Sequence, residues 1–191
     1  MKIALDEKIE TIAHHFGKIM EALGLDIRTP PLADTPKRVA RMYVEELFTG
    51  LDPDQFPEMA YFSPPAPEEE GKLVAIRDIT FNRMCEHHFV PMSGTASIAY
   101  LPKKKLLGLS KINRLVDYFS RRPQIQERLT VQIANSLSLL LETEDVAVRI
   151  LATHQCVTMR GIQDPNSKTL TQDFRGKFLT DASLVQQFLA N

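Results

Sequence analysis

Residues 73–81 read Leu73-Val-Ala-Ile-Arg-Asp-Ile-Thr-Phe81, and residues 95–101 read Thr95-Ala-Ser-Ile-Ala-Tyr-Leu101. The first stretch is rich in branched residues and the second alternates small or polar positions with apolar ones, so both predict β-strands. Residues 146–150 alternate in the same way and predict a further strand that runs toward His154 and Cys156. The polar tail from Gly161 is a candidate for pairing at a sheet edge.

Two helices are predicted between the second and third of these strands. Leu109-Ser110 indicates a helix start, and the next apolar residues recur at helical spacing as far as Phe119. Arg121-Arg122-Pro123 interrupts this pattern, and residues 125–141 then predict a second helix. Strands, a helix pair and more strands indicate an α+β fold, in which an antiparallel sheet carries two helices on one face.

The chain before the first strand divides into two regions. Residues 1–50 form an N-terminal helical region, with one amphipathic helix ending near Gly24 and a second that starts at Asp34-Thr35-Pro36 and ends near Gly50. Residues 51–72 contain five prolines and form a Pro-rich acidic connection. Residues 73–191 are expected to form the catalytic domain.

Composition restricts the class of protein. Of 191 residues, 23 are Lys or Arg and 24 are Asp or Glu, giving a net charge of -1. This balance argues against a nucleic-acid or anionic-membrane surface, and Lys103-Lys-Lys105 is interpreted as a solvated turn. No apolar run approaches the roughly 18 residues that a membrane span needs. We expect a cytoplasmic protein in a reducing compartment, without structural disulfides.

The two cysteines lie in two short clusters with three of the five histidines, Cys85-Glu-His87-His88 and His154-Gln-Cys156. Thiolate and imidazole are ligands that suit zinc. On an extended segment His154 and Cys156 would share a face, whereas His87 and His88 would not. Spacing leaves several alternatives open: a closed Cys2His2 structural zinc, an open three-ligand site with a water, two unrelated buried thiols, or a disulfide.

Five spaced blocks resemble the signature blocks of zinc-dependent GTP cyclohydrolase I, over about Thr35 to Phe178. The blocks, in chain order, are Thr35-Pro-Lys-Arg38-Val-Ala-Arg41-Met-Tyr43, Cys85-Glu-His-His-Phe89, Gly108-Leu-Ser-Lys-Ile-Asn-Arg114, Arg122-Pro-Gln-Ile-Gln-Glu-Arg128-Leu129 and His154-Gln-Cys156-Val-Thr-Met-Arg160-Gly161. A resemblance that covers a whole domain is far more specific than one motif.

The resemblance implies hydrolytic opening of the imidazole ring of GTP's guanine, release of formate and formation of dihydroneopterin triphosphate, the entry step to folate or other pterins. It also implies the tunnelling fold, which is an antiparallel sheet with two helices on one side. In this family the sheets join into rings, and two rings stack into a toroidal homodecamer with active sites at the subunit interfaces. A closed ring removes exposed sheet edges.

By the same resemblance, Cys85, His88 and Cys156 are the zinc ligands, and the fourth position is left for water. Bound zinc lowers the pKa of water to roughly 7, which provides a nucleophile at neutral pH. His87 and His154 match the non-ligand histidines. We assign His87 to protonation of the purine ring nitrogen and His154 to proton transfers at the ribose.

The substrate-binding residues also follow from the resemblance. Glu127 and Gln126 match the pair that reads the base, where a carboxylate accepts the N–H donors of guanine. On spacing alone they would be ordinary residues of a helix surface. The residues that match the triphosphate-binding positions are Ser110, Lys111, Arg114 and Arg160, with Arg38 and Arg41 as further contributors.

Two rival interpretations belong to other classes. In one, a metal closed by four side chains stabilises a non-catalytic binding module. In the other, a zinc enzyme of the same fold acts on a different purine or pterin. The set of Lys and Arg residues favours a nucleoside triphosphate.

Overall fold

A computed structural model describes residues 3–62, 66–67 and 70–190 of the chain. Its centre is a four-stranded antiparallel sheet in the order β2–β3–β5–β6. The strands are β2 (Val74–Met84), β3 (Pro91–Tyr100), β5 (Val146–His154) and β6 (Thr169–Phe174). The first two strands extend three or four residues further toward their connecting turn than the sequence pattern indicated, and β6 pairs at the edge as predicted.

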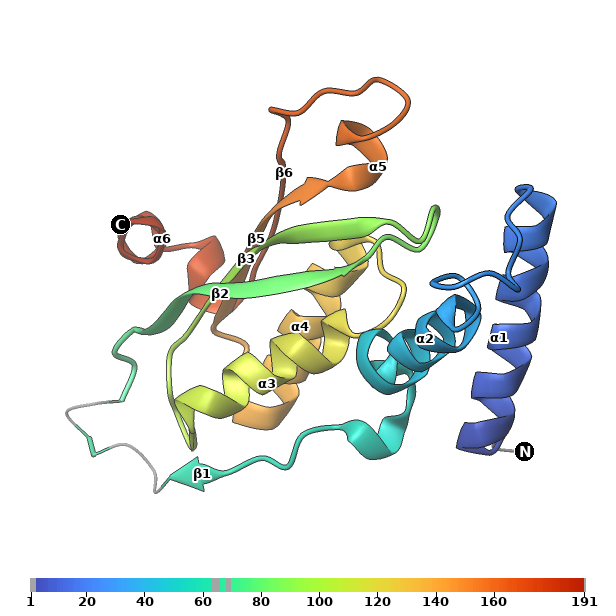
Figure 1. The fold of residues 1–191 in the computed structure, drawn as a ribbon. Helices are drawn as coiled ribbons and strands as arrows, with labels where there is room; N and C mark the ends of the chain where they lie inside the picture. Colours follow the sequence, from blue (N-terminus) through green and yellow to red (C-terminus); the bar gives the residue numbers. More distant parts are fainter. Residues whose placement is uncertain (1–2, 63–65, 68–69, 191) are drawn as a thin grey trace.

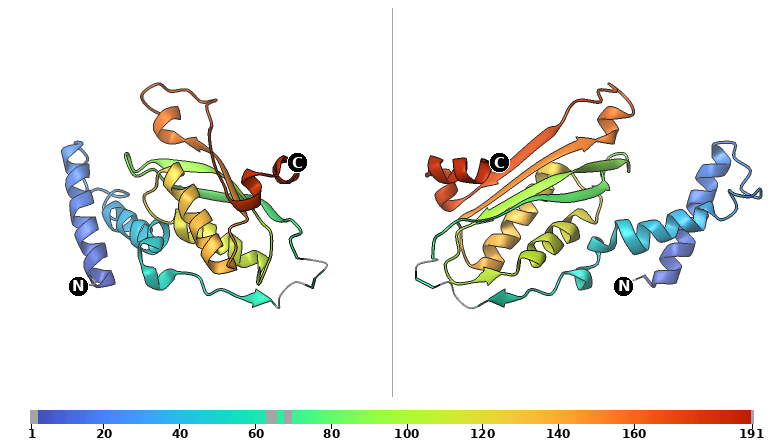
Figure 2. Two further views of the ribbon diagram at one scale, coloured as in Figure 1. Left: turned by 180° about the vertical axis from the view of Figure 1, so that it is seen from behind. Right: turned by 60° about the vertical axis from the view of Figure 1, so that its left-hand side comes forward.

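The helices α3 (Leu109–Ser120) and α4 (Gln126–Leu141) lie side by side on one face of the sheet (Figures 1 and 2). They bury the apolar side of the central strands, and Ile98, Ile150 and Leu137 in this core are fully inaccessible to solvent. The predicted α+β class and the helix pair on one face are confirmed. This architecture is consistent with the tunnelling fold.

A smaller core lies on the opposite face of the sheet. After β6, the chain forms a short 3-10 helix, η4 (Gly176–Leu179), and a final helix, α6 (Ala182–Leu189). Phe178 and Phe188 pack there against Ala99 and Ala147 of the central strands. The sequence pattern did not predict this C-terminal helix, which covers one end of the otherwise open face (Figure 2).

The N-terminal region projects from one end of the sheet (Figure 1). Its first helix, α1 (Leu5–Ala22), packs along α2 (Thr35–Arg41). The predicted second helix does not remain α-helical, because a π-helical segment, η1 (Met42–Leu47), continues it. Two aromatic residues in and just after this segment contact Phe89: the ring centroid of Tyr43 lies 6.3 Å from that of Phe89, and the ring centroid of Phe48 lies 5.5 Å from it.

The connection between the helices and the sheet contains short ordered elements. Two 3-10 turns, η2 (Thr49–Leu51) and η3 (Pro53–Gln55), precede β1 (Tyr61–Phe62), which pairs with β4 (Leu106–Leu107). Residues 63–65 and 68–69 of the predicted connection lie outside the described residues. Among the helices that the structure describes, none combines the length and apolarity needed to cross a bilayer.

Asp145 joins three segments at the end of the sheet. Its side chain is 5% exposed, accepts the backbone N–H of Lys177 at 2.8 Å and pairs with Lys103 Nζ at 2.8 Å. Burial disfavours its ionisation, but the hydrogen bonds from Lys103 and the Lys177 N–H outweigh this cost and lower the pKa. Residues 103–104 are exposed bends, as the sequence interpretation of a solvated turn expected, and Lys103 is in addition an ion-pair partner of the buried Asp145.

Replacing Asp145 by Asn should lower the free energy of unfolding by about 1–3 kcal/mol at pH 7, because Lys103 loses the buried carboxylate with which it forms an ion pair. A lowered pKa in the folded state stabilises the protein above the unfolded pKa of about 3.9, and this stabilisation disappears as the pH falls through the folded value. Urea unfolding should therefore show a difference between wild type and D145N that narrows in acid. Glu142→Gln is the control, because Glu142 forms an exposed pair with Lys105, and its free energy of unfolding should stay close to that of wild type. If wild type and D145N differ by the same amount at every pH, this account of Asp145 is contradicted.

Candidate metal centre

Three side chains from two distant parts of the chain meet at one end of the sheet. Cys85 and His88 belong to the turn between β2 and β3, and Cys156 follows β5. One ligand atom from each of these residues lies within 4.8 Å of the other two. Among the described residues, these three form the group of cysteine, histidine and carboxylate side chains able to hold a metal ion.

Backbone hydrogen bonds hold the turn that carries Cys85 and His88. The Cys85 N–H donates to Val90 O and the Phe89 N–H donates to Cys85 O, both at 2.9 Å. Phe89 has a φ of 52°, in the left-handed region that a non-glycine residue seldom adopts. An isolated parallel bridge also joins Cys85 to Gln124, just before α4. The turn is therefore fixed both to its own hairpin and to the start of α4.

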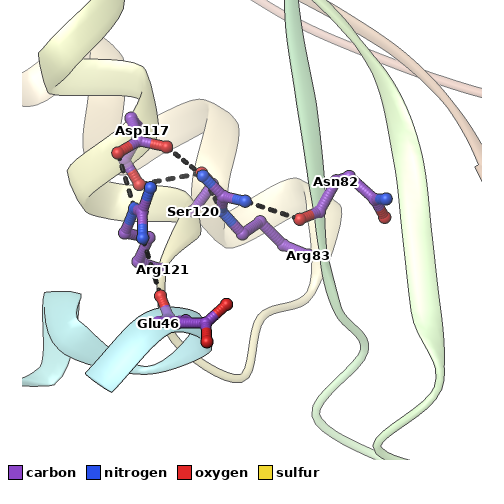
Figure 3. Close-up of polar contacts among 6 residues, drawn as sticks. All are labelled: Glu46, Asn82, Arg83, Asp117, Ser120 and Arg121. Carbon is purple, nitrogen blue, oxygen red and sulfur yellow. Dashed lines mark hydrogen bonds and ion pairs between the residues drawn. The ribbon is translucent and has the colours of Figure 1, made fainter. Parts of the chain in front are cut away.

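An ion-pair cluster behind the turn fixes the end of β2 (Figure 3). Arg83 pairs with Asp117 of α3 and donates to Ser120 Oγ at 3.1 Å. Asp117 also accepts Arg121 Nε at 2.6 Å, and Arg121 Nη1 donates to Glu46 O at 2.7 Å. These contacts connect β2, α3 and η1 two residues before the first candidate ligand. Nothing in the spacing of these residues predicted the cluster, because they come from three separate elements.

The second cluster does not have the extended geometry that the sequence indicated. Strand β5 ends at His154, and Cys156 lies in a single helical turn, α5 (Gln155–Thr158). The prediction that His154 and Cys156 share a face of an extended segment was therefore wrong. The two side chains separate: Cys156 joins Cys85, whereas His154 contacts Gln126.

The donor set fits a thiophilic divalent metal such as zinc. Both thiols are free, so the alternative of a disulfide is not what the structure shows. Burial, and then the adjacent Cys85 thiol, raise the pKa of Cys156. In a tetrahedral zinc site with bond lengths of about 2.0–2.3 Å, ligand atoms lie about 3.5–3.8 Å apart. A small closure of the three side chains meets this geometry.

His154 is held by a buried amide. Gln126, 1% exposed, donates its amide hydrogens among Ile150 O, Thr169 O and Thr171 Oγ1 at 3.0–3.1 Å. Its Oε1 must therefore face His154 Nε2, 2.8 Å away, and that nitrogen must carry a hydrogen. In neutral His154 the other ring nitrogen, Nδ1, is left as the proton acceptor.

Burial lowers the pKa of His154, while the charge of nearby Glu127 opposes the shift. The imidazole is therefore mainly neutral at pH 7. Two threonines hold the Gln126 residue that supports His154. The Thr130 hydroxyl donates to Gln126 O, and the Thr171 hydroxyl lies 2.7 Å from the Thr130 hydroxyl. Sequence reasoning missed Thr130 and Thr171, since a Thr on a helix or edge strand carries no distinctive spacing.

Glu127 and His87 are both exposed and lie at this end of the molecule. Glu127 is in the first turn of α4, next to Gln126. Arg128, the next residue, pairs with Glu86 in the metal-site turn at 2.5 and 3.0 Å, so the start of α4 and the turn are tied together. His87 Nδ1 lies 4.0 Å from Cys85 Sγ, but His87 is not a member of the three-residue group.

The predicted phosphate-binding residues come from three separate segments of the chain: α2, α3 and the residues just after α5. Arg160 Nη1 lies 3.1 Å from His88 Nε2, at the metal centre. Ser110 and Lys111, by contrast, are in the first turn of α3, about 15 Å along the helix from Ser120. Arg114 is one turn further along α3, and Arg38 and Arg41 are on α2 (Figure 1).

An α+β fold that carries a Cys-His-Cys group beside two further histidines defines a candidate metal-dependent enzyme of hydrolase type. The family model described as GTP cyclohydrolase I matches residues 12–191. The chain belongs to the GTP cyclohydrolase I family.

Curated relatives extend over nearly the whole chain. A GTP cyclohydrolase 1 of Haemophilus influenzae (strain Rd) is 46% identical over 187 residues, which is 98% of this chain and 85% of the relative. The GTP cyclohydrolase 1 of Aeromonas hydrophila is 48% identical over 189 residues, which is 98% of this chain and 86% of the relative. That of Shewanella sp. (strain W3-18-1) is 46% identical over 184 residues, or 96% and 85% of the two chains.

The raised pKa of Cys156 predicts that metal binding releases about one proton from this thiol at pH 7, because only the thiolate is a ligand. Calorimetric titration of Zn²⁺ into metal-stripped protein, in buffers of different ionisation enthalpy, counts the protons released. Cys156→Ser should weaken metal binding and release fewer protons. The same proton count for both proteins would exclude Cys156 from the ligand set.

Proposed function

We propose that this chain hydrolyses GTP at a zinc site, releasing formate and forming dihydroneopterin triphosphate, the first step of folate or pterin biosynthesis. The observation that carries the proposal is the convergence of Cys85, His88 and Cys156 at the end of the sheet where His154 and the start of α4 also lie. Zinc bound there supplies a Lewis acid and activates water. The remaining steps fall to side chains of the protein.

His154 is suited to accept and return a proton. Gln126 holds its Nε2–H, so the acceptor Nδ1 is the nitrogen available to substrate. Its lowered pKa keeps this acceptor unprotonated at neutral pH. We assign it to proton transfers at the ribose. His87, exposed in the metal-site turn, is assigned to protonating the purine ring nitrogen.

Glu127 is the proposed reader of guanine. Its carboxylate is exposed in the first turn of α4, close enough to His154 to influence its pKa. A carboxylate there accepts the paired N–H groups of guanine, which adenine lacks. Gln126 contributes differently from the sequence-based expectation, because its side-chain amide is already bonded within the chain. Its proposed role is to hold His154.

We further propose that the active site is completed between subunits of a homo-oligomer, namely a toroidal homodecamer. Ser110 and Lys111 lie in the first turn of α3, about 15 Å along the helix from Ser120, which bonds to Arg83 beside the metal-site turn, and Arg114 follows one turn later; we expect the first two not to reach the metal centre of their own chain. A neighbouring subunit can supply them there. Strands β2 and β6 are the two edges of the sheet and offer unpaired backbone groups for joining sheets edge to edge. Arg38 and Arg41 are proposed as further phosphate ligands.

The rival closed structural zinc site is less well supported. It requires a fourth protein ligand, yet His154 is engaged by Gln126 and His87 is outside the group of three. An enzyme for another purine or pterin differs from our proposal in its substrate, which the assay below tests directly.

Metal-loaded protein incubated with GTP should yield formate together with a pterin that becomes fluorescent on oxidation. ATP should yield neither, because its base lacks the donors that Glu127 accepts. Cys85→Ser is the metal-site control and should abolish both products. Formate release without a fluorescent pterin would indicate a different ring-opening reaction, and no formate from the metal-loaded protein would overturn the proposal.

His87→Ala should retain zinc but lose turnover by about 10²–10⁴-fold, the usual contribution of a positioned acid or base. Zinc content by elemental analysis and kcat with GTP are the two measurements. Cys85→Ala is the comparison, since it removes a ligand. If His87→Ala loses as much zinc as Cys85→Ala, then His87 is a ligand and the closed site is favoured.

A further inference from the structure

Arg160 makes a hydrogen bond that its proposed role in phosphate binding does not explain. It lies just after α5, and its Nη1 is 3.1 Å from Nε2 of His88, a candidate metal ligand. A guanidinium has only donors, so the imidazole nitrogen must accept with its lone pair. Both side chains are exposed, and the contact therefore has no burial holding it in place.

This hydrogen bond and metal coordination require the same lone pair. A neutral imidazole has one nitrogen with a lone pair and one nitrogen with a hydrogen. A metal takes the lone pair, and the other nitrogen then carries the hydrogen as a donor. Whichever nitrogen of His88 faces the metal, it no longer has an acceptor to offer to Arg160. The two interactions exclude one another at His88.

We infer that Arg160 is a metal-gated phosphate ligand: its guanidinium is held on His88 in the metal-free protein and is released to the substrate triphosphate when a metal occupies the site. The inference rests on the proposed function for the identity of the phosphate. Its consequence is positive coupling between metal and triphosphate. Each should bind more tightly in the presence of the other, by the same factor.

The proposed exchange of Arg160 between His88 and phosphate also explains why a metal ligand and a phosphate ligand lie close together in the chain. Arg160 follows Cys156 by four residues, so one short segment carries both a metal ligand and a phosphate ligand. Metal binding at Cys156 and His88 separates Arg160 from its partner at the place where the nucleotide must arrive. A triphosphate that enters before the metal meets a guanidinium that is already hydrogen-bonded.

The first test measures zinc affinity and needs no substrate. Metal-stripped wild type and Arg160→Met compete for Zn²⁺ with a chromophoric chelator, in low salt and in about 1 M salt, where the Debye length is about 3 Å. Arg160→Met should bind zinc about three- to tenfold more tightly, since one competing hydrogen bond is gone. The gain should persist in high salt. A gain that vanishes there reflects charge repulsion alone and overturns the gate, as does equal or weaker binding.

Arg28→Met is the matched control. It removes the same charge at an exposed position whose partner is Asp26, in the loop after α1. Its zinc affinity should equal that of wild type. Circular dichroism verifies that each variant is folded.

The second test measures the coupling itself. Inorganic triphosphate is used as its Mg²⁺ complex, and its affinity for each protein is measured with and without bound zinc. Zinc should raise the affinity of wild type about three- to tenfold more than that of Arg160→Met. An equal gain in both proteins would overturn the gate. Failure of the GTP assay would overturn the proposed reaction while leaving both of these binding tests intact.

Discussion

The pairing of β3 with β5 is the constraint on which the rest of the structure depends. Its register sets Met92 opposite His154, while the β2–β3 hairpin sets Met84 opposite Pro91. The end of β5 therefore meets the turn that carries Cys85 and His88. A Cβ on Gly94 in β3 would lie 2.2 Å from Leu151 O, so this close approach of the strands requires glycine. A shift of one residue would reverse the faces of β5 and separate the thiols.

Side-chain hydrogen bonds and ion pairs then hold the residues around the candidate metal centre in place. The buried Gln126 amide joins α4, β5 and β6 around His154. The pair of Arg83 and Asp117 joins β2 to α3, two residues before Cys85 in the chain (Figure 3). Such networks rigidify a site when every member is satisfied. They leave the exposed groups, His87, Glu127 and Arg160, able to meet a ligand. Rigid support and accessible chemistry are thus divided between different residues of the same short segments.

The parts of the fold that the sequence predicted well are those with a local periodic pattern. The helix pair at 109–120 and 126–141 and the strand from Val146 matched within a few residues, because burial of one face imposes a period on the sequence. The π-helical segment, the helical turn at Cys156 and the C-terminal α6 were missed. At the π-helical segment, the aromatic contacts of Phe48 with Phe89 accompany the departure from the local pattern. The helix α6 does have a local signal that the sequence interpretation overlooked, because Asp181 caps its start and Leu184 and Phe188 recur at helical spacing.

The sequence by itself determined the α+β class and the ligand chemistry, since two cysteines beside three histidines can be recognised without coordinates. Its five spaced blocks also pointed to the family. Spacing alone left open which of these side chains converge, and the resemblance named Cys85, His88 and Cys156; the tertiary structure brings these three together and shows that Gln126 is bonded inside the chain. The physical reason is that strand register and the direction of a side chain at the end of a strand are set by partners more than 20 residues away, and spacing along the chain does not encode them.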